Sequence, residues 1–402
     1  VAASPGAGFA ETARYQHLEA EKFPWYEQRL WGLYDVPDYV LNLFNFPVIA
    51  YSGEKDKQIQ AARVMEEAYQ REGHKLTHLI GPGMEHKYHP DTLRDLQRRL
   101  AEIAARGRPE QPAVATLETR TLRYARSGPL ELLGLAEHWH DSRAVLDWDR
   151  KQLNTVGATA LRLTLPAEIS GRRNLQIDGQ WLDLPEAREA IFTRGPHQWQ
   201  LADRYPPDNS LRKLPGLQGP IDDAFLRPFL VVVPSGQSTH PRVERWVQFE
   251  LAHFLDRWRR LFRGEARVKV DTAVDDRDLH RYHLIAWGDP DSNRLLARLA
   301  DKLPLVWSRD ELKVGGDEFA AAQHVPMMVY PNPLAPDRYV VLNSGMTFRE
   351  GHDTSNSLQT PKLPDWAVVD LDSPPDALAP GKIAAAGFFD EQWRFRRDAN
   401  AH

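Results

Sequence analysis

Two short apolar runs, each followed by a polar loop and a helical stretch, constrain the fold of this chain most. The first run spans residues 46–51 and leads into the loop 52–56. The second spans residues 76–80 and leads into the loop 81–86. The first run does not alternate apolar with polar residues, which is typical of a parallel strand covered on both faces, and the second is predicted as a further strand. Because residues 58–71 carry apolar side chains at helical spacing, the pattern predicts consecutive strand–loop–helix units of an α/β domain.

The two loops carry an acid and a histidine, Asp56 and His86. Since the carboxyl ends of neighbouring parallel strands meet at one edge of a sheet, we expect these two side chains to meet and bond there. A histidine that takes a proton from a hydroxyl group, oriented by a buried carboxylate, is the acid–base pair of a serine hydrolase. We therefore predict Asp56 and His86 as catalytic residues and rank the neighbouring Glu54 and His89 below them.

A second interpretation of these residues is structural. Aspartate is among the preferred residues at a helix N-cap, so Asp56 would cap the helix that begins near Lys57, and His86 would be an ordinary loop residue. His86 and His89 supply only two imidazoles, which do not indicate a metal site without a third ligand. We expect no metal and no cofactor.

Residues 46–56, followed by Gly83-Met84-Glu85-His86, resemble the C-terminal catalytic part of the prolyl oligopeptidase family of serine hydrolases. The resemblance covers residues 1–106, and related esterases and depolymerases share the same loops. It implies the C-terminal half of an α/β-hydrolase sheet and a peptide or ester substrate. It also implies that Asp56 is the triad acid and His86 the triad base.

The nucleophile of that family lies in a Gly-x-Ser-x-Gly segment, which has no match in this chain. Ser235 and Ser344 follow apolar runs, but neither has the flanking pair of glycines. Both also come after His86, against the family order of serine, acid and histidine. We therefore expect that the chain begins just after its nucleophile and is inactive alone. The missing N-terminal part of the same protein is then an expected partner.

The pattern changes twice along the rest of the chain. After a linker at 107–112, short alternating segments predict a β-sandwich domain over residues 109–221, with an Asp-Gly hairpin turn at 178–179. Residues 222–402 return to buried apolar runs and helices, which predicts a second, Rossmann-like α/β domain. Together with residues 1–108, the C-terminal part of an α/β-hydrolase catalytic domain, the sequence predicts three domains.

Composition excludes several classes of function. The 51 basic and 56 acidic residues give a formal charge of -5, which is too balanced to indicate nucleic-acid binding. No stretch approaches the roughly 20 apolar residues of a membrane span. There is no cysteine, so disulfides and thiolate chemistry are excluded. This absence fits a cytoplasmic protein as well as an extracytoplasmic one, so the location stays open, with a secreted or periplasmic one slightly favoured.

The leading hypothesis is a serine hydrolase of peptide or ester bonds, and one of a different class competes with it. In the alternative, the β-sandwich and the C-terminal α/β domain bind a polymer, a glycan or a peptide, without catalysis. Exposure of Trp139, Trp148 and Trp181 on one sandwich face would favour binding, and their burial would weaken it.

Overall fold

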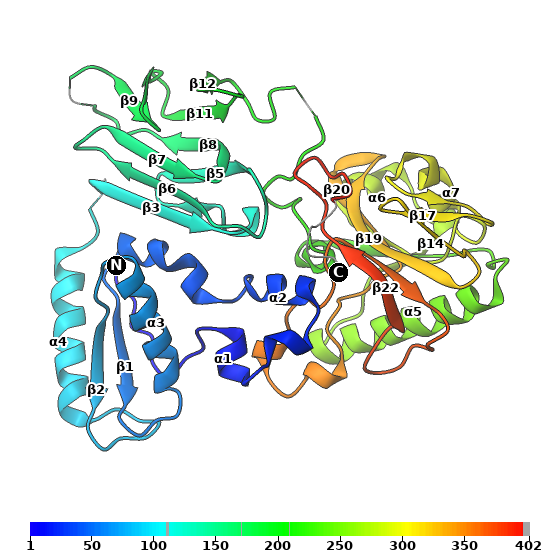
Figure 1. Cartoon of the computed structure of the whole chain (residues 1–402), viewed down its shortest axis with the longest axis horizontal. Helices are drawn as coiled ribbons and strands as arrows, with labels where there is room; N and C mark the ends of the chain where they lie inside the picture. The colour runs from blue at the N-terminus through cyan, green and yellow to red at the C-terminus, as the bar shows by residue number, and fades with distance from the viewer. Residues whose placement is uncertain (110–111, 170, 209, 397–402) are drawn as a thin grey trace. The chain divides into compact units, whose positions relative to one another are not determined.

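The fold is mixed α/β, with helices and strands in several sheets (Figure 1). The computed structural model describes residues 1–109, 112–169, 171–208 and 210–396. The chain divides into two compact units: Val1–Lys22 with Trp31–Ser210, and Phe23–Leu30 with Leu211–His402. The boundary predicted at 108/109 lies within the first unit, and residues 110–111 of the predicted linker lie outside the described residues.

A small parallel sheet in the first unit carries the two loops that the sequence singles out. β1 (Ile49–Gly53) pairs in parallel with β2 (Thr77–Gly81), and isolated parallel bridges add Ala3 and Gly6 to the other side of β1. The helix α3 (Ile59–Arg71) connects the two strands, and α4 (Pro90–Arg106) follows β2. The strand–helix order predicted for this segment is confirmed.

The two helices cover opposite faces of this sheet (Figure 1). Ile49 and Tyr51 of β1 pack with Leu96 of α4. Ala50, which lies between them in the strand, packs with Ala68 of α3. Because alternate residues face opposite helices, the strand has no polar face, which explains its uninterrupted apolar run.

Two five-stranded sheets complete the first unit, in the orders β10-β9-β7-β6-β3 and β12-β11-β8-β5-β4. Their strands, with one 3-10 turn, are β3 (Val114–Thr119), η3 (Leu122–Tyr124), β4 (Arg126–Ser127), β5 (Leu130–Leu135), β6 (Ser142–Asp147), β7 (Gln152–Val156), β8 (Ala158–Thr164), β9 (Asn174–Ile177), β10 (Gln180–Asp183), β11 (Glu189–Arg194) and β12 (Trp199–Ala202). Both sheets contribute to one apolar core, with Leu117 and Leu146 from the first and Leu161 and Phe192 from the second.

Four short helices precede β1 in the sequence: α1 (Thr12–Gln16), η1 (Ala20–Lys22), α2 (Trp25–Trp31) and η2 (Val36–Asn45). Two asparagines of η2 bind the edge strand β3. The amide of Asn45 donates to Thr116 O (2.7 Å) and accepts from Thr116 N (2.9 Å), and Asn42 does the same with Glu118. These amides satisfy backbone groups that an uncovered edge would leave unpaired.

The second unit is built on a seven-stranded sheet of order β14-β13-β15-β20-β19-β21-β22. The pairs from β14 to β20 are parallel, and the pairs from β20 to β22 are antiparallel. The elements are η4 (Ile221–Leu226), β13 (Phe229–Val233), α5 (Pro241–Phe262), β14 (Val268–Val270), η5 (Asp271–Ala273), α6 (Asp276–Arg281), β15 (His283–Ala286), α7 (Arg294–Leu299), η6 (Ala300–Lys302), β19 (His324–Asn332), β20 (Ala335–Leu342), η7 (Glu350–His352), η8 (Asn356–Leu358), β21 (Trp366–Asp370) and β22 (Lys382–Gly387). A separate three-stranded sheet contains β16 (Val306–Trp307), β17 (Leu312–Val314) and β18 (Asp317–Phe319).

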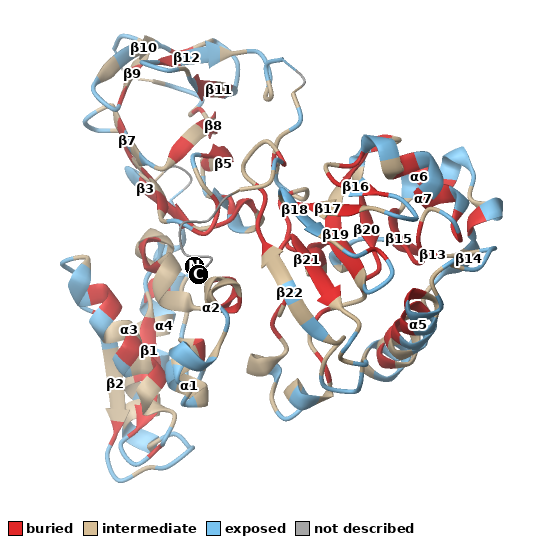
Figure 2. Ribbon diagram, turned by 45° about the vertical axis from the view of Figure 1, so that its right-hand side comes forward, coloured by how far each residue is buried: buried red, intermediate tan, exposed pale blue. Residues whose placement is uncertain are grey.

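The long helix α5 is buried on one side and exposed on the other (Figure 2). Its buried side includes Trp246 and Phe254 but also two charged residues, Glu250 and Arg257. Ionised side chains are rarely buried without a partner, so these two require one. Of the described helices, none has both the length and the apolar composition that crossing a bilayer requires.

Candidate active site

The structure brings the two predicted loops together at the carboxyl ends of β1 and β2. The strands end at Gly53 and Gly81, which are partners in the register. The backbone pairing then continues into the loops, because Glu54 N donates to Gly81 O (3.0 Å) and Lys55 N donates to Met84 O (2.8 Å). The acid loop and the histidine loop are therefore bonded to each other directly.

Gly53 makes this close approach possible. A Cβ atom at this position would lie 2.0 Å from the backbone oxygen of Glu85 and 2.5 Å from that of Met84. Any other residue would therefore push the two loops apart, which is the close backbone approach that glycine permits.

The buried side chain of Tyr51 anchors the far end of the histidine loop. Its hydroxyl donates to Lys87 O (3.0 Å) and accepts a hydrogen bond from His89 N (2.7 Å). Gly81 provides the space for this hydroxyl, since a Cβ there would lie 2.1 Å from it. The loop is thus held on both sides of His86.

Asp56 and His86 form the expected contact, with Asp56 Oδ2 lying 3.1 Å from His86 Nδ1. The Asp56 side chain is 6% exposed and that of His86 is 70% exposed. The other carboxylate oxygen, Oδ1, accepts from Gln58 N (2.9 Å) at the start of α3. Asp56 therefore holds the turn that precedes α3, whose N-cap residue is Gln58 and not Asp56 as the structural interpretation expects, and it contacts the imidazole as the catalytic one expects.

The two lower-ranked residues have other partners. Glu54 Oε2 accepts from Gly83 N (2.7 Å), so this carboxylate joins the two loops rather than facing His86. His89 precedes α4 as its N-cap residue, and its backbone N–H binds Tyr51. The contact with an acid thus distinguishes His86 from His89.

The serines considered as nucleophiles lie elsewhere. Ser235 hydrogen-bonds Asp271, and Ser344, which is 1% exposed, donates to Gly345 O (2.8 Å). In the described part of the chain, no serine hydroxyl hydrogen-bonds His86, and its Nε2 makes no hydrogen bond. The ring nitrogen that a base would use is therefore unoccupied.

A second serine–histidine–acid arrangement lies beneath α3, and the sequence pattern did not predict it. Ser52 Oγ lies 3.0 Å from His78 Nε2, and His78 Nδ1 lies 3.0 Å from Glu66 Oε1. Burial would raise the pKa of Glu66, but hydrogen bonds from Arg63 and His78 outweigh it and lower this pKa. Because Ser52 is 1% exposed, a substrate cannot reach its hydroxyl, and the arrangement connects β1, β2 and α3 structurally.

The three tryptophans considered for the binding alternative differ in exposure. Trp139 is 5% exposed and Trp148 packs against the core that the two five-stranded sheets share, whereas Trp181 on β10 is 55% exposed. Within the described residues, no group of three or more histidine, aspartate or glutamate side chains is arranged to hold a metal ion. One exposed tryptophan does not make an aromatic binding face.

The chain was compared with protein families, curated proteins and solved structures. No family model, no curated protein and no solved structure matches it. The geometry of the sites is therefore the basis for assigning a function.

Proposed function

We propose that residues 1–108 are the acid–base part of a serine hydrolase that cleaves peptide or ester bonds. The observation that carries the proposal is the contact between a buried Asp56 carboxylate and an exposed His86 imidazole on adjoining, mutually bonded loops. This is the relation that a histidine base and its orienting acid have in serine hydrolases.

Each residue has a defined role in this proposal. With Nδ1–H donating to Asp56, the free lone pair of His86 is on Nε2, which lies on the exposed side chain. His86 takes the proton of a serine hydroxyl as the serine attacks the carbonyl carbon, and then returns it to the leaving amine or alkoxide. The Asp56 carboxylate fixes the ring tautomer and stabilises the imidazolium between these two steps.

The nucleophilic serine in this proposal comes from outside the 402 residues. The unoccupied Nε2 of His86 supports this, since no described serine hydroxyl bonds it. Residues 1–108 are assigned to the C-terminal half of an α/β-hydrolase sheet, which the parallel pairing of β1 with β2 supports. Residues 109–221 are assigned to a β-sandwich and residues 222–402 to a Rossmann-like α/β domain. The shared core of two sheets and the parallel strands β14 to β20 support these assignments.

The test uses the protein made from the coding sequence extended upstream of Val1. A fluorophosphonate probe should label one serine of a Gly-x-Ser-x-Gly segment there, and His86→Ala should abolish the labelling. His89→Ala is the matched control and should label normally. The 402-residue chain alone should remain unlabelled. Labelling of Ser235 or Ser344, or labelling that survives His86→Ala, would overturn the proposal.

A further inference from the structure

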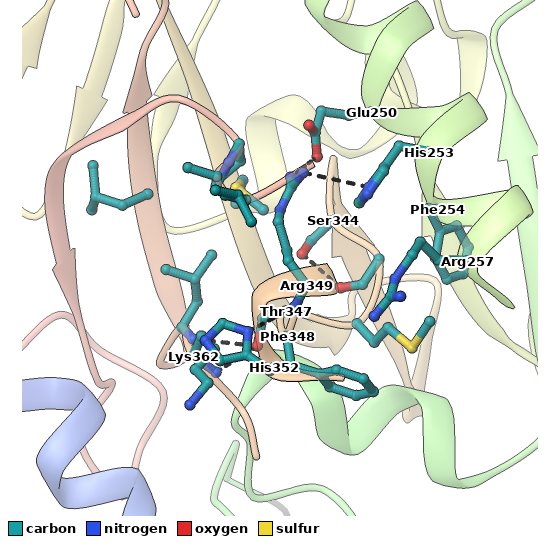
Figure 3. Close-up of a pocket in the computed structure, with 18 of the residues that line it drawn as sticks. Glu250, His253, Phe254, Arg257, Ser344, Thr347, Phe348, Arg349, His352 and Lys362 are labelled. Carbon is teal, nitrogen blue, oxygen red and sulfur yellow. Dashed lines mark hydrogen bonds and ion pairs between the residues drawn. The ribbon is translucent and has the colours of Figure 1, made fainter. Parts of the chain in front are cut away.

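The second unit contains a pocket that the proposed hydrolase chemistry does not use. Its volume is about 210 Å³, and it lies between α5, the segment after β20 and the segments before β21 and β22 (Figure 3). Residues Tyr26 and Glu27, from Phe23–Leu30, complete its wall. All of these residues belong to the same compact unit.

The charged residues of the wall are paired with one another. Arg349 binds Glu250 Oε2, and Lys362 Nζ lies 2.8 Å from Glu27 Oε1. Arg257 forms two hydrogen bonds with Asp353, at 2.5 and 2.9 Å. Every cation that lines the pocket therefore has a carboxylate partner.

These pairs make a charged ligand a poor match for the pocket. An anion would meet no unpaired cation, and Glu350, which contacts His253 at 3.1 Å, adds a further carboxylate to the cluster. The two histidines of the wall do not supply positive charge, because burial lowers the pKa of His253 and lowers that of His352 to about 4. A cation would compete with Arg349 and Lys362 for carboxylates that they already neutralise.

The hydrogen-bonding capacity that remains is both donor and acceptor. Lys362 Nζ also binds Thr360 Oγ1 (3.2 Å), which leaves one of its three N–H groups, and Glu27 Oε2 makes no hydrogen bond in the described part of the chain. Glu250 Oε1 and Arg257 Nε are likewise buried without hydrogen-bond partners. The Lys362–Glu27 pair thus offers a donor and an acceptor close together, while Glu250 adds an acceptor and Arg257 adds a donor.

A hydroxyl group matches this arrangement because it donates and accepts from the same oxygen. In a secondary amide the donor and the acceptor point to opposite sides of a planar group, which fits adjacent wall atoms less well. Apolar surface from Phe254, Phe348 and Ile383 completes the lining and suits the C–H faces of a ring. The pocket is somewhat larger than the roughly 150 Å³ cavity that holds a benzene ring, which is the scale of one sugar ring.

We propose that this pocket binds one neutral sugar residue, with Glu27 and Lys362 as its main hydrogen-bonding pair. Sugar hydroxyls donate to Glu27 and accept from Lys362, while the ring lies against the apolar wall. The site is separate from Asp56 and His86 and does not depend on the hydrolase proposal.

The test is ligand-observed NMR on the 402-residue chain with the methyl glycosides of glucose, galactose, mannose and N-acetylglucosamine. At least one should bind saturably, and Glu27→Gln/Lys362→Met, which removes the pair without leaving a lone charge, should weaken binding by about tenfold or more. The control is Arg242→Met/Asp372→Asn, the same change at an exposed ion pair outside the pocket, which should leave binding unchanged. Melting temperatures establish that both variants fold.

Four outcomes would overturn the proposal. They are no saturable binding of any glycoside up to about 50 mM, binding that the pocket variant leaves intact, equal losses in both variants, and tighter binding of a charged or amide probe. Glucuronate, glucosamine and N-acetylalanine methylamide serve as those probes. Tighter binding of the amide would make the pocket a peptide site.

Discussion

Both units place a histidine against a carboxylate at the same distance, but the surroundings differ. Asp56 lies 3.1 Å from His86 in the first unit, and Glu350 lies 3.1 Å from His253 in the second. The His86 side chain is 70% exposed and has a free second nitrogen. The His253 side chain is 16% exposed, and its second nitrogen lies 3.4 Å from Arg349.

The difference shows that an acid–histidine contact alone does not define a base. A general base needs an accessible nitrogen that holds a lone pair at the operating pH. His86 has the accessible nitrogen, whereas the second nitrogen of His253 lies 3.4 Å from the Arg349 guanidinium, and burial, which lowers the pKa of His253, makes it a weaker base. We therefore propose proton transfer for His86 and a structural role for His253.

The largest expected effect separates these two histidines by hydrolytic rate. In the protein extended upstream of Val1, if it carries the proposed serine, His86→Gln should lower kcat by about 10³–10⁴-fold, because no base remains to take the serine proton. His253→Gln should leave kcat within about twofold, since it is not in the reaction path. Ester hydrolysis under saturating substrate measures both. A comparable loss in the two variants would remove the distinction.

The next effect concerns stability and contrasts buried with exposed ion pairs. At pH 8, Arg349→Met should destabilise the second unit by about 3–5 kcal/mol, because Glu250 is left buried without its cation. Burial raises the pKa of Glu250 to about 7, so its protonation at lower pH would relieve part of this loss. The exposed Arg242→Met should cost no more than about 1 kcal/mol. Urea unfolding followed by tryptophan fluorescence measures the difference, and equal losses would contradict it.

In the first unit, Glu118 should make stability fall as the pH rises. Burial raises its pKa from 4.5 to about 7, so the folded state binds the proton more tightly than the unfolded state. The resulting stability, roughly 3 kcal/mol, is fully present below pH 4.5 and is lost as the pH rises through 7. Glu118→Gln should remove this dependence of stability on pH. Hydrogen exchange of the β3 amides, followed across the pH range, measures it. An unchanged pH profile would show that Glu118 does not cause it.

In the second unit, His283 should make stability fall as the pH falls. Burial lowers its pKa from 6.5 to about 4, with smaller contributions from Arg338 and Arg227. The stability it contributes, also roughly 3 kcal/mol, is present above pH 6.5 and is lost as the pH falls through 4. His283→Gln can still accept a hydrogen bond from Tyr339 N, but it cannot take up a proton at low pH. In this variant, hydrogen-exchange protection of the β15 amides should therefore decrease less as the pH falls. A larger decrease than in the unchanged protein would contradict the role of His283.

The smallest expected effect concerns the buried Ser52–His78–Glu66 arrangement. Ser52→Ala should cost about 1 kcal/mol, the loss of one buried hydrogen bond, and should leave the hydrolytic rate unchanged. Thermal unfolding and ester hydrolysis provide the two readouts. A large fall in rate at unchanged stability would instead make Ser52 a catalytic residue.

The contact between Asp56 and His86 could be predicted because it follows from local pattern and sheet geometry. Two parallel strands ending at the same level bring their loops to one edge. Strand ends were less predictable: residues 115–124 alternate in the sequence, but the strand β3 ends at Thr119. There the Thr121 hydroxyl accepts from Arg123 N (3.3 Å) and stabilises a 3-10 turn instead.

The pocket could not be predicted in the same way. Its polar wall joins Glu27, Glu250, Arg349 and Lys362, which lie far apart in the sequence and in no shared motif. From the sequence alone, a single glutamate on a helix such as Glu250 is predicted to be exposed. Its burial against Arg349 follows from tertiary contacts that the sequence pattern does not show. Sites made by tertiary contacts between distant segments leave no periodic signal.

The assignment of Phe23–Leu30 to the second unit has a consequence for the design of fragments of this protein and for its folding during synthesis. A fragment starting at Leu211 would lack Glu27, leaving Lys362 without its carboxylate and the pocket without part of its wall. During synthesis, the eight residues Phe23–Leu30 leave the ribosome some 180 residues before the rest of their unit, which begins at Leu211. Neither unit is therefore a continuous, separable piece of polypeptide.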